Sequence, residues 1–218
     1  DRDTLFVGTD FGPGSLSESG YPRIVKEWKR GAPLAAASTV YEAAPGDMAA
    51  SGYQDNSPGF ERAFVVRQID FYTSELFLRR EGHLLRIAKP LDANAFALRD
   101  QLVIELRSDW AIGGVTYPQG ALLATGFDDF MAGGRAFEVL FAPTPTASLD
   151  GVAATKTCLL LTVLDNVKNR VTELRREGDR WIRRDVAVPG MGSLGVSALD
   201  ADNSDDYFLT VTDFLHPT

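Results

Sequence analysis

The sequence predicts an all-β protein, a β-propeller built from four-stranded antiparallel blades. Strand-like runs recur in sets, and each set opens after a loop rich in proline or glycine. The opening runs start about 44 to 56 residues apart, and a period in this range with about four strands in each repeat is typical of propeller blades. These opening runs are residues 49–53, 95–99, 151–155 and 195–199.

The N-terminal part, residues 5–42, predicts about three strands. Residues 5–9 form a short apolar strand, which the loop at residues 12–14 ends with glycine and proline. Extended structure resumes at residues 21–28 and stops at Gly31 and Pro33.

The set that opens at residue 95 predicts further strands at residues 102–106, 121–127 and 137–141. Its longer spacing is explained by a hairpin extension at residues 108–120, because insertions in propellers lie in loops. Residues 128–134 predict one helical turn, with Asp128 as its cap and Gly133 at its end.

In the next set, residues 159–164 are apolar enough for a strand buried on both faces. We therefore expect Leu160, Leu161 and Val163 to be buried, and Cys158 to be a small core residue with an inert thiol. The segments 171–175 and 181–188 flank a turn at 177–179 and are more polar, as outer strands are.

We expect residues 1–218 to form a single propeller domain of about four to five blades, with three complete blades and a partial blade at each end. An unpaired edge strand is an aggregation hazard. The two partial ends are therefore predicted to pair, with residues 195–199 and 207–214 joining strands from residues 5–42 in one mixed blade.

Composition excludes several partners. The formal net charge is −8 and is spread along the chain, which argues against a nucleic-acid or anionic-membrane surface. No apolar run reaches the roughly 18 residues that span a bilayer, and the N-terminus lacks a signal-peptide pattern. One basic cluster is interpreted as a solvated hairpin around Gly178; it comprises Arg175, Arg176, Arg180, Arg183 and Arg184.

Residues for catalysis are not predicted, nor is a cofactor or a metal site. No serine lies in a G-x-S-x-G turn; Ser15 and Ser193 are the nearest candidates, and both lack the spacing. The two histidines, His83 and His216, are expected at the surface.

Two further motifs are weak matches to known binding sites, one for calcium and one for phosphate. The acidic run Asp200, Asp202, Asp205 and Asp206 lacks the glycine and the terminal glutamate of a calcium loop, which favours a solvated strand connection. Two Gly-x-Gly fragments have no helix after them, and loop punctuation explains them better than phosphate binding. They are Gly12 with Gly14 and Gly190 with Gly192.

A competing class is a five-bladed propeller glycoside hydrolase, in which carboxylates end the inner strands around a channel. No sugar-binding aromatic cluster accompanies the candidates, and a fold alone does not establish function. The carboxylates in or just after candidate inner strands are Asp10, Asp70, Glu105, Asp165 and Asp213.

Four segments carry a resemblance to a known family: LFVGTDFGPGSLSESGYPRIVKEWKRGAPL (5–34), YPQGALLATGFDDFMAG (117–133), VLDNVKNRV (163–171) and DDYFLTVTDFLHPT (205–218). In this order they resemble the β-propeller that precedes the catalytic domain in the prolyl oligopeptidase family of serine peptidases. That propeller has seven blades, which at this period need on the order of 300 residues, so we expect a truncated ring. The absence of an initiator methionine at Asp1 likewise suggests an excised piece.

The resemblance implies a non-catalytic role. In the family the propeller covers the active site of an α/β-hydrolase domain, so that only short peptides reach the serine and are cleaved after proline. The implied partners are therefore the hydrolase domain of the parent protein and short proline-containing peptides, with the parent a soluble cytoplasmic or periplasmic prolyl endopeptidase. A free-standing propeller that binds protein partners stays open as an alternative.

Overall fold

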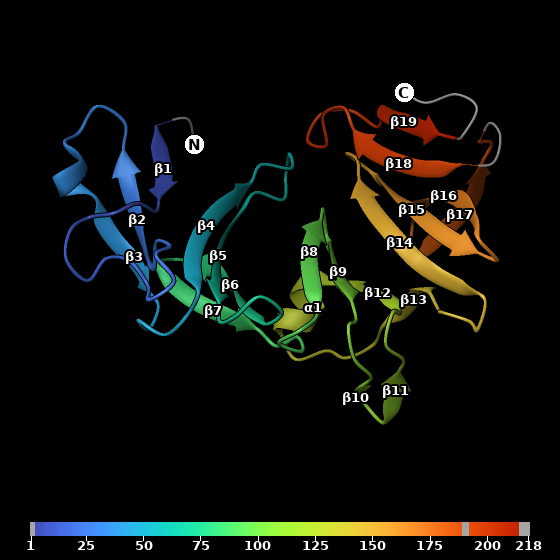
Figure 1. The fold of residues 1–218 in the computed structure, drawn as a ribbon, viewed down its shortest axis with the longest axis horizontal. Coiled ribbons are helices and arrows are strands. Elements are labelled where there is room, and N and C mark those ends of the chain that lie inside the picture. Colours follow the sequence, from blue (N-terminus) through green and yellow to red (C-terminus); the bar gives the residue numbers. More distant parts are fainter. Residues whose placement is uncertain (1–2, 189–191, 214–218) are drawn as a thin grey trace. The chain divides into compact units, whose positions relative to one another are not determined.

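The computed structural model describes residues 3–188 and 192–213 and shows an all-β chain (Figure 1). The chain divides into two compact units. Unit 1 comprises Asp1–Asn56 and Phe60–Ala93, and unit 2 comprises Ser57–Gly59 and Asn94–Thr218. Each unit is described by itself.

Unit 1 contains two antiparallel sheets whose strands are ordered as in the sequence. The three-stranded sheet consists of β1 (Thr4–Val7), β2 (Ile24–Lys29) and β3 (Ser38–Glu42), with the short 3-10 helix η1 (Leu34–Ala36) before β3. The four-stranded sheet consists of β4 (Ala49–Asp55), β5 (Arg62–Gln68), β6 (Ser74–Arg80) and β7 (His83–Ile87).

Unit 2 contains two four-stranded sheets, a two-stranded sheet and a separate hairpin. The first sheet consists of β8 (Asn94–Leu98), β9 (Gln101–Glu105), β12 (Leu122–Gly126) and β13 (Glu138–Phe141). The second consists of β14 (Ala147–Ala154), β15 (Cys158–Asp165), β16 (Lys168–Glu177) and β17 (Arg180–Val186). The two-stranded sheet consists of β18 (Ser193–Ala198) and β19 (Tyr207–Thr212).

The predicted blades are confirmed, because each of the three four-stranded sheets is an antiparallel meander. The predicted hairpin extension is also present, as β10 (Trp110–Ile112) and β11 (Val115–Tyr117), and it leaves the sheet between β9 and β12 (Figure 1). Ring contacts at the base of this hairpin place Trp110 and Tyr117 within 5.6 Å of the Phe137 centroid. The longer repeat therefore contains a complete four-stranded blade and, in addition, the β10–β11 hairpin.

The predicted helical turn is α1 (Phe127–Met131), but its cap differs from the prediction. Gly126 occupies the N-cap position without a side-chain hydrogen bond, and Asp128 lies in the first turn, where its charge favours the helix N-terminus. Gly133 follows the helix with φ +100°, a left-handed conformation that suits glycine.

The core of unit 2 centres on β15, as its apolar sequence predicts. Leu159 and Leu161 belong to a buried cluster with Val103, Leu122 and Leu174, and Leu160 and Cys158 are buried as well. Val163 is only partly buried and packs at the margin of this cluster, so the prediction of full burial is wrong at that position. The strand leaves the core toward its C-terminal end, where exposed residues of the turn follow.

The two sheets of unit 1 approach closely at Gly52 on β4. A Cβ atom at this position would lie 2.9 Å from Cγ of Phe6 and 3.0 Å from Cγ1 of Val25. Glycine therefore allows these side chains of the three-stranded sheet to pack against the backbone of β4, and Val25 joins Ala50 and Val65 in the core of the unit.

The predicted mixed blade stays a prediction. In the described residues β19 is hydrogen-bonded to β18, and β1 to β3 form a sheet of their own. Phe214 lies outside the described residues, as do Gly190 and His216.

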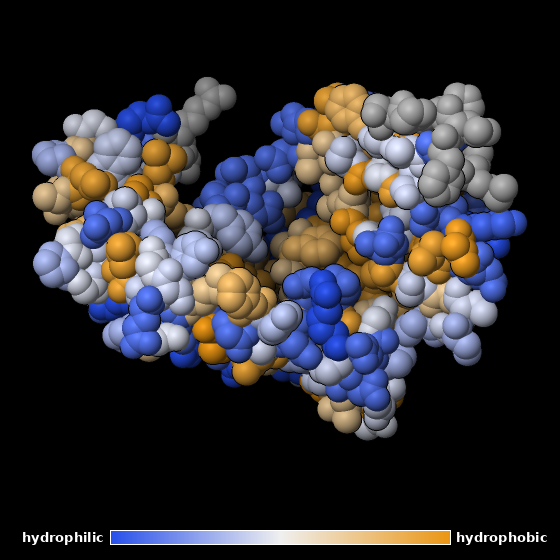
Figure 2. Space-filling view, viewed as in Figure 1, coloured by the Kyte–Doolittle hydropathy of each residue, from blue (hydrophilic) through white to orange (hydrophobic). Residues whose placement is uncertain are grey.

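No helix in the described part of the chain is both long and apolar enough to cross a membrane. On the face drawn in Figure 2, hydrophilic and hydrophobic residues are interspersed.

Candidate functional site

The candidate nucleophiles and bases take structural positions. Ser15 is buried, its Oγ accepts a hydrogen bond from the Phe11 backbone N–H at 2.8 Å, and its hydroxyl lies 2.6 Å from the carbonyl oxygen of Gly12. Ser193 begins β18 and His83 begins β7, and both side chains are exposed. The hydrogen bonds of Ser15 therefore stabilise its own loop. In the described part of the chain, no hydrogen bond joins Ser15 or Ser193 to His83 as a nucleophile to its base.

Two carboxylates of the glycoside hydrolase alternative begin tight turns. Asp10 Oδ1 accepts hydrogen bonds from the Gly12 N–H at 2.8 Å and the Ser15 hydroxyl at 2.9 Å, and these bonds lower the pKa of Asp10. Asp70 Oδ1 accepts from the N–H groups of Tyr72 at 2.8 Å and Thr73 at 2.7 Å, which lowers the pKa of Asp70 in the same way. Both are the local side-chain-to-backbone bonds by which aspartate initiates a turn.

Glu105 and Asp165 also have local partners. Glu105 accepts a hydrogen bond from Asn94 Nδ2 at 3.0 Å, and Asp165 accepts from Asn166 Nδ2 at 2.9 Å and forms an ion pair with Arg170. Asp70 follows the second strand of its sheet, and Glu105 and Asp165 each end the second strand of theirs. Asp70 and Asp165 precede short turns to the third strand, whereas Glu105 precedes the connection that carries β10 and β11.

The acidic run of the β18–β19 connection forms hydrogen bonds within that connection. Asp200 accepts hydrogen bonds from the N–H groups of Asp202 and Asn203, and Asp206 accepts one from the Ser204 hydroxyl. Among residues 3–188 and 192–213 no group of three or more histidine, cysteine, aspartate or glutamate side chains could hold a metal ion.

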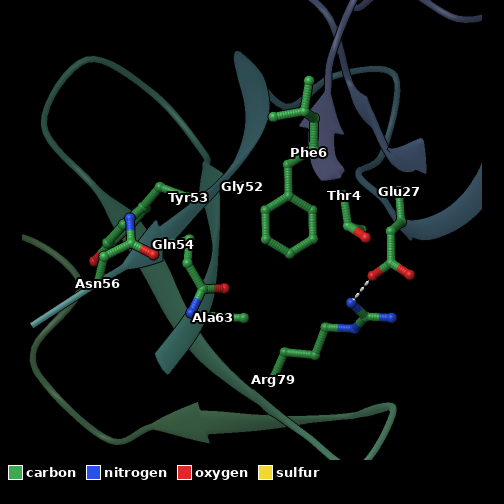
Figure 3. A pocket seen from close by; sticks show the side chains of 10 residues that line it. Thr4, Phe6, Glu27, Gly52, Tyr53, Gln54, Asn56, Ala63 and Arg79 are labelled. Carbon is green, nitrogen blue, oxygen red and sulfur yellow. Dashed lines mark hydrogen bonds and ion pairs between the residues drawn. The ribbon is translucent and has the colours of Figure 1, made fainter. Parts of the chain in front are cut away.

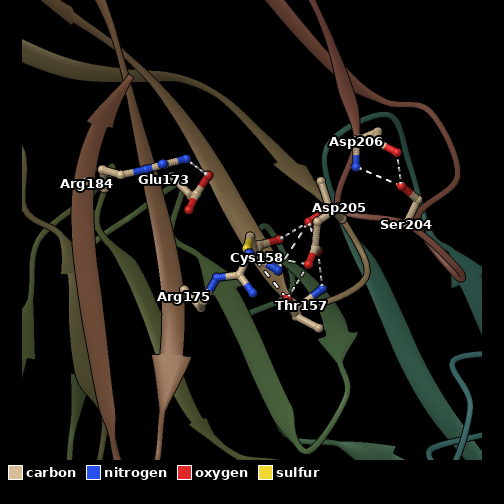
Figure 4. A network of polar contacts seen from close by, with 9 residues as sticks. Thr157, Cys158, Glu173, Arg175, Arg184, Ser204, Asp205 and Asp206 are labelled. Carbon is tan, nitrogen blue, oxygen red and sulfur yellow. Dashed lines mark hydrogen bonds and ion pairs between the residues drawn. The ribbon is translucent and has the colours of Figure 1, made fainter. Parts of the chain in front are cut away.

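Asp205 instead joins the β18–β19 connection to the β14–β15 turn, and Figure 4 shows its carboxylate directed toward Thr157. Its Oδ1 accepts hydrogen bonds from the Thr155 hydroxyl and the Thr157 N–H, both at 2.7 Å, and its Oδ2 accepts from the Thr157 hydroxyl at 2.6 Å. Arg175 Nη2 lies 3.4 Å from Oδ2. Burial raises the pKa of Asp205, but the bonds from Thr157 and Thr155 outweigh it, so the net shift is downward.

Cys158 borders this network, and its predicted position in the core is confirmed. Its side chain is buried, and burial raises the pKa of the thiol. A thiol in that state is a poor nucleophile at neutral pH because the reactive species is the thiolate.

The basic hairpin β16–β17 is largely solvated, as interpreted from sequence: Arg183 and Arg184 are exposed, and Arg175 and Arg176 are partly buried. Gly178 forms its tip, and Arg180 is exposed as expected. Arg176 donates a hydrogen bond to Oε1 of the buried Gln101 at 2.8 Å, and Arg183 donates one to the Leu140 carbonyl of the neighbouring sheet. These arginines therefore connect adjacent blades of unit 2.

A cavity of about 270 Å³ lies between the two sheets of unit 1 (Figure 3). The ring of Phe6 points into it, and the ion pair between Arg79 and Glu27 borders one side, with Gln54 on another. Because Arg79 and Glu27 neutralise each other, the cavity presents no net charge from this pair to a ligand. It offers no pair of groups for acid–base chemistry and is best described as a gap between the two sheets with a mixed polar and apolar lining.

The turn after β5 carries a feature that the sequence analysis missed. Phe71 is 80% exposed and Tyr72 is 85% exposed, and no other large hydrophobic residue of unit 1 is as exposed in its described part. The signal was present in the sequence as two adjacent aromatic residues between the turn-forming Asp70 and Thr73. We call residues 70–73 the aromatic turn.

These blades define the β-propeller fold. Comparison with known proteins shows which propeller proteins the chain resembles. No family model matches the chain. The chain is 28% identical over 228 residues to an uncharacterized peptidase, y4nA, of Sinorhizobium fredii, and the similarity covers all of the chain and 31% of that protein. It is 23% identical over 192 residues to an uncharacterized peptidase, RP174, of Rickettsia prowazekii, which covers 84% of the chain and 27% of that protein.

Solved structures of peptidases also resemble the chain. A post-proline cleaving enzyme from Rickettsia typhi superimposes with a TM-score of 0.88 at 22% identity, over 98% of the chain and 32% of that enzyme. A prolyl endopeptidase gives a TM-score of 0.68 at 16% identity, over 98% of the chain and 30% of that enzyme. Oligopeptidase B from Trypanosoma brucei gives 0.62 at 13% identity, over 90% of the chain and 27% of that enzyme.

The predicted resemblance is confirmed: the chain has the fold of the propeller region of prolyl oligopeptidases. It spans about a third of the length of the relatives that it matches.

Proposed function

We propose that this chain is the non-catalytic propeller region of a serine peptidase similar to the prolyl oligopeptidases. In this proposal it restricts access to a hydrolase domain of the same polypeptide, which cleaves short peptides after proline. The observation that carries the proposal is the match of 98% of the chain to 32% of a post-proline cleaving enzyme, at a TM-score of 0.88.

The chain's own residues support a covering role more than a chemical one. Ser15 is held in its loop, and the candidate carboxylates Asp10 and Asp70 are held in turns. Excluding large substrates needs a rigid wall of packed sheets rather than a reactive group. The buried clusters of units 1 and 2 supply such rigidity within each unit.

The first test is activity. We expect the chain alone to leave a proline-containing chromogenic peptide uncleaved, and the product of the complete gene to cleave it in a reaction that a serine-reactive phosphonate blocks. Phosphonate-sensitive turnover by the chain alone would contradict the proposal. Downstream coding sequence with G-x-S-x-G followed by aspartate and histidine would support it, whereas a stop codon after Thr218 would favour a free-standing binding propeller.

The second test addresses access. The same proline-containing site is presented in a short peptide and within a much longer unfolded polypeptide, with trypsin as the control protease that cleaves both at similar rates. We expect the complete gene product to cleave only the short peptide efficiently. Equal rates on both substrates would show that no part of the protein selects by size.

A further inference from the structure

We propose that the aromatic turn is a docking contact for the hydrolase domain, with Phe71 and Tyr72 as its anchors; this inference rests on the proposed function. The two side chains are 80% and 85% exposed. Aromatic side chains carry a large share of the binding energy at protein interfaces, and exposed apolar clusters in soluble proteins mark interaction sites. Leu91, whose carbonyl oxygen accepts a hydrogen bond from the Ser74 N–H, adds a partly exposed apolar residue beside the turn.

The turn is already ordered for binding. Asp70 Oδ1 accepts the N–H groups of Tyr72 and Thr73, the Asp70 carbonyl oxygen accepts a hydrogen bond from Gln68 Nε2 at 2.6 Å, and the Ile69 N–H donates to the Thr73 carbonyl oxygen at 3.0 Å. A preorganised contact loses less conformational entropy when its partner binds. The backbone therefore holds both rings outward before any partner is present.

A second turn in the same unit shows that this exposure is not a requirement of the turn. Asp10 and Phe11 also follow a strand, and Asp10 caps its turn as Asp70 does. Phe11 is nevertheless partly buried, and Lys26 Nζ lies 4.3 Å from the centroid of its ring. Within unit 1, the phenylalanine of one Asp-Phe turn, Phe11, is therefore partly buried, whereas that of the other, Phe71, is exposed to solvent.

The occupant is the hydrolase domain of the proposed function, and the length of the relatives leaves room for it outside this chain. The chain corresponds to 31% of the y4nA peptidase and 32% of the Rickettsia typhi enzyme, so more than two-thirds of such a protein lies outside this chain. A hydrolase domain in the same polypeptide is present at high effective concentration, so a small aromatic contact suffices to hold it.

The test is hydroxyl-radical footprinting of the chain alone and of the complete gene product. We expect oxidation of Phe71 and Tyr72 to be slowed by about fivefold or more in the complete protein, as for anchors buried in an interface. Tyr53 is the internal control, because it lies toward the opposite end of the sheet, where Asp55 pairs with Arg62. Its oxidation is expected to be unchanged.

A variant pair provides the second readout. Phe71→Ser with Tyr72→Ser should leave the melting temperature of the chain alone unchanged and lower that of the complete protein. Leu34→Ser, which removes another exposed hydrophobic residue of unit 1, should change neither.

Four results would overturn the contact. They are equal oxidation in both proteins, protection in the chain alone that grows with its concentration, protection that arises only when a proline-containing peptide is added, and equal protection in a gene product cut immediately before its hydrolase domain. The second result would indicate a second copy as the occupant, and the third would indicate substrate. Peptidase activity of the same preparation tests the proposed function separately: activity without protection contradicts only the contact, and protection without activity contradicts only the peptidase assignment.

Discussion

Replacement of Leu161 by alanine tests the placement of the central strand of unit 2. Leu161 lies in the middle of β15, opposite Val152 on β14 and Thr172 on β16, and is 1% exposed. It belongs to the buried cluster that also contains Leu159 and Leu174. The substitution removes side-chain carbons from a fully buried position within this cluster.

The magnitude follows from transfer and packing. Each buried methylene contributes about 0.8 kcal/mol, so loss of the apolar carbons of leucine removes roughly 2 kcal/mol of transfer free energy. The residual cavity adds to this loss, because strands fixed by ladders on both sides collapse little, and Leu→Ala changes in cores cost about 2 to 5 kcal/mol in total. We expect a value within that range for Leu161→Ala.

The measurement is urea unfolding of parent and variant, followed by tryptophan fluorescence, since Trp181 belongs to the same cluster. Leu199→Ala, at an exposed position of unit 2, is the matched control and should change the free energy of unfolding by less than about 0.5 kcal/mol. Coincident curves for Leu161→Ala and the parent would refute the placement of β15 in the core. An equal loss in the control would show that the assay does not report burial.

Three other predictions follow from particular residues. Val167 is 92% exposed and has φ +65° in the β15–β16 turn, so Val167→Gly should raise the free energy of unfolding by about 1 kcal/mol in urea titration, and a loss would contradict the strain. Burial lowers the pKa of Lys89 from 10.5 to about 8, so between these two pH values the folded state binds fewer protons than the unfolded state. The free energy of unfolding should therefore rise with pH from about 8 to 10.5, by up to roughly 3 kcal/mol. Lys89→Met should abolish this rise, whereas parallel pH profiles for variant and parent would contradict the assignment. Finally, if residues 195–199 and 207–214 complete a mixed blade with strands from residues 5–42, amide exchange at Tyr207–Thr212 should be slow in the monomer, and fast exchange, or protection that needs dimerisation, would mean that the blade stays open.

The fold class and most strands could be predicted from sequence because they depend on local patterns. The apolar run that becomes β15, the glycine and proline loops between sets, and the insertion that becomes β10 and β11 are all visible without contacts between distant residues. The same local reasoning placed Val163 in the core, which is wrong. A run of apolar residues does not show at which residue a strand stops being covered by neighbouring segments.

The candidate site was harder to predict because its interactions join distant positions. Asp205 belongs to an acidic run in the sequence, yet its carboxylate accepts hydrogen bonds from Thr155 and Thr157, which lie about fifty residues earlier. Arg176 and Arg183 were expected to be solvated, and they also donate hydrogen bonds to Gln101 and to the Leu140 carbonyl oxygen. Only the packing of one blade beside the next brings such partners together.

The sequence by itself determined that the chain forms repeated antiparallel blades, since strand periodicity and turn chemistry act between residues close in the chain. Tertiary structure decided the roles of the polar residues. Asp10 and Asp70 became turn caps, Asp205 became a connection between strands of unit 2, and Phe71 with Tyr72 remained bare. The physical reason is that a side chain's role depends on which groups share its desolvated surroundings, and that is set by contacts between segments far apart in sequence.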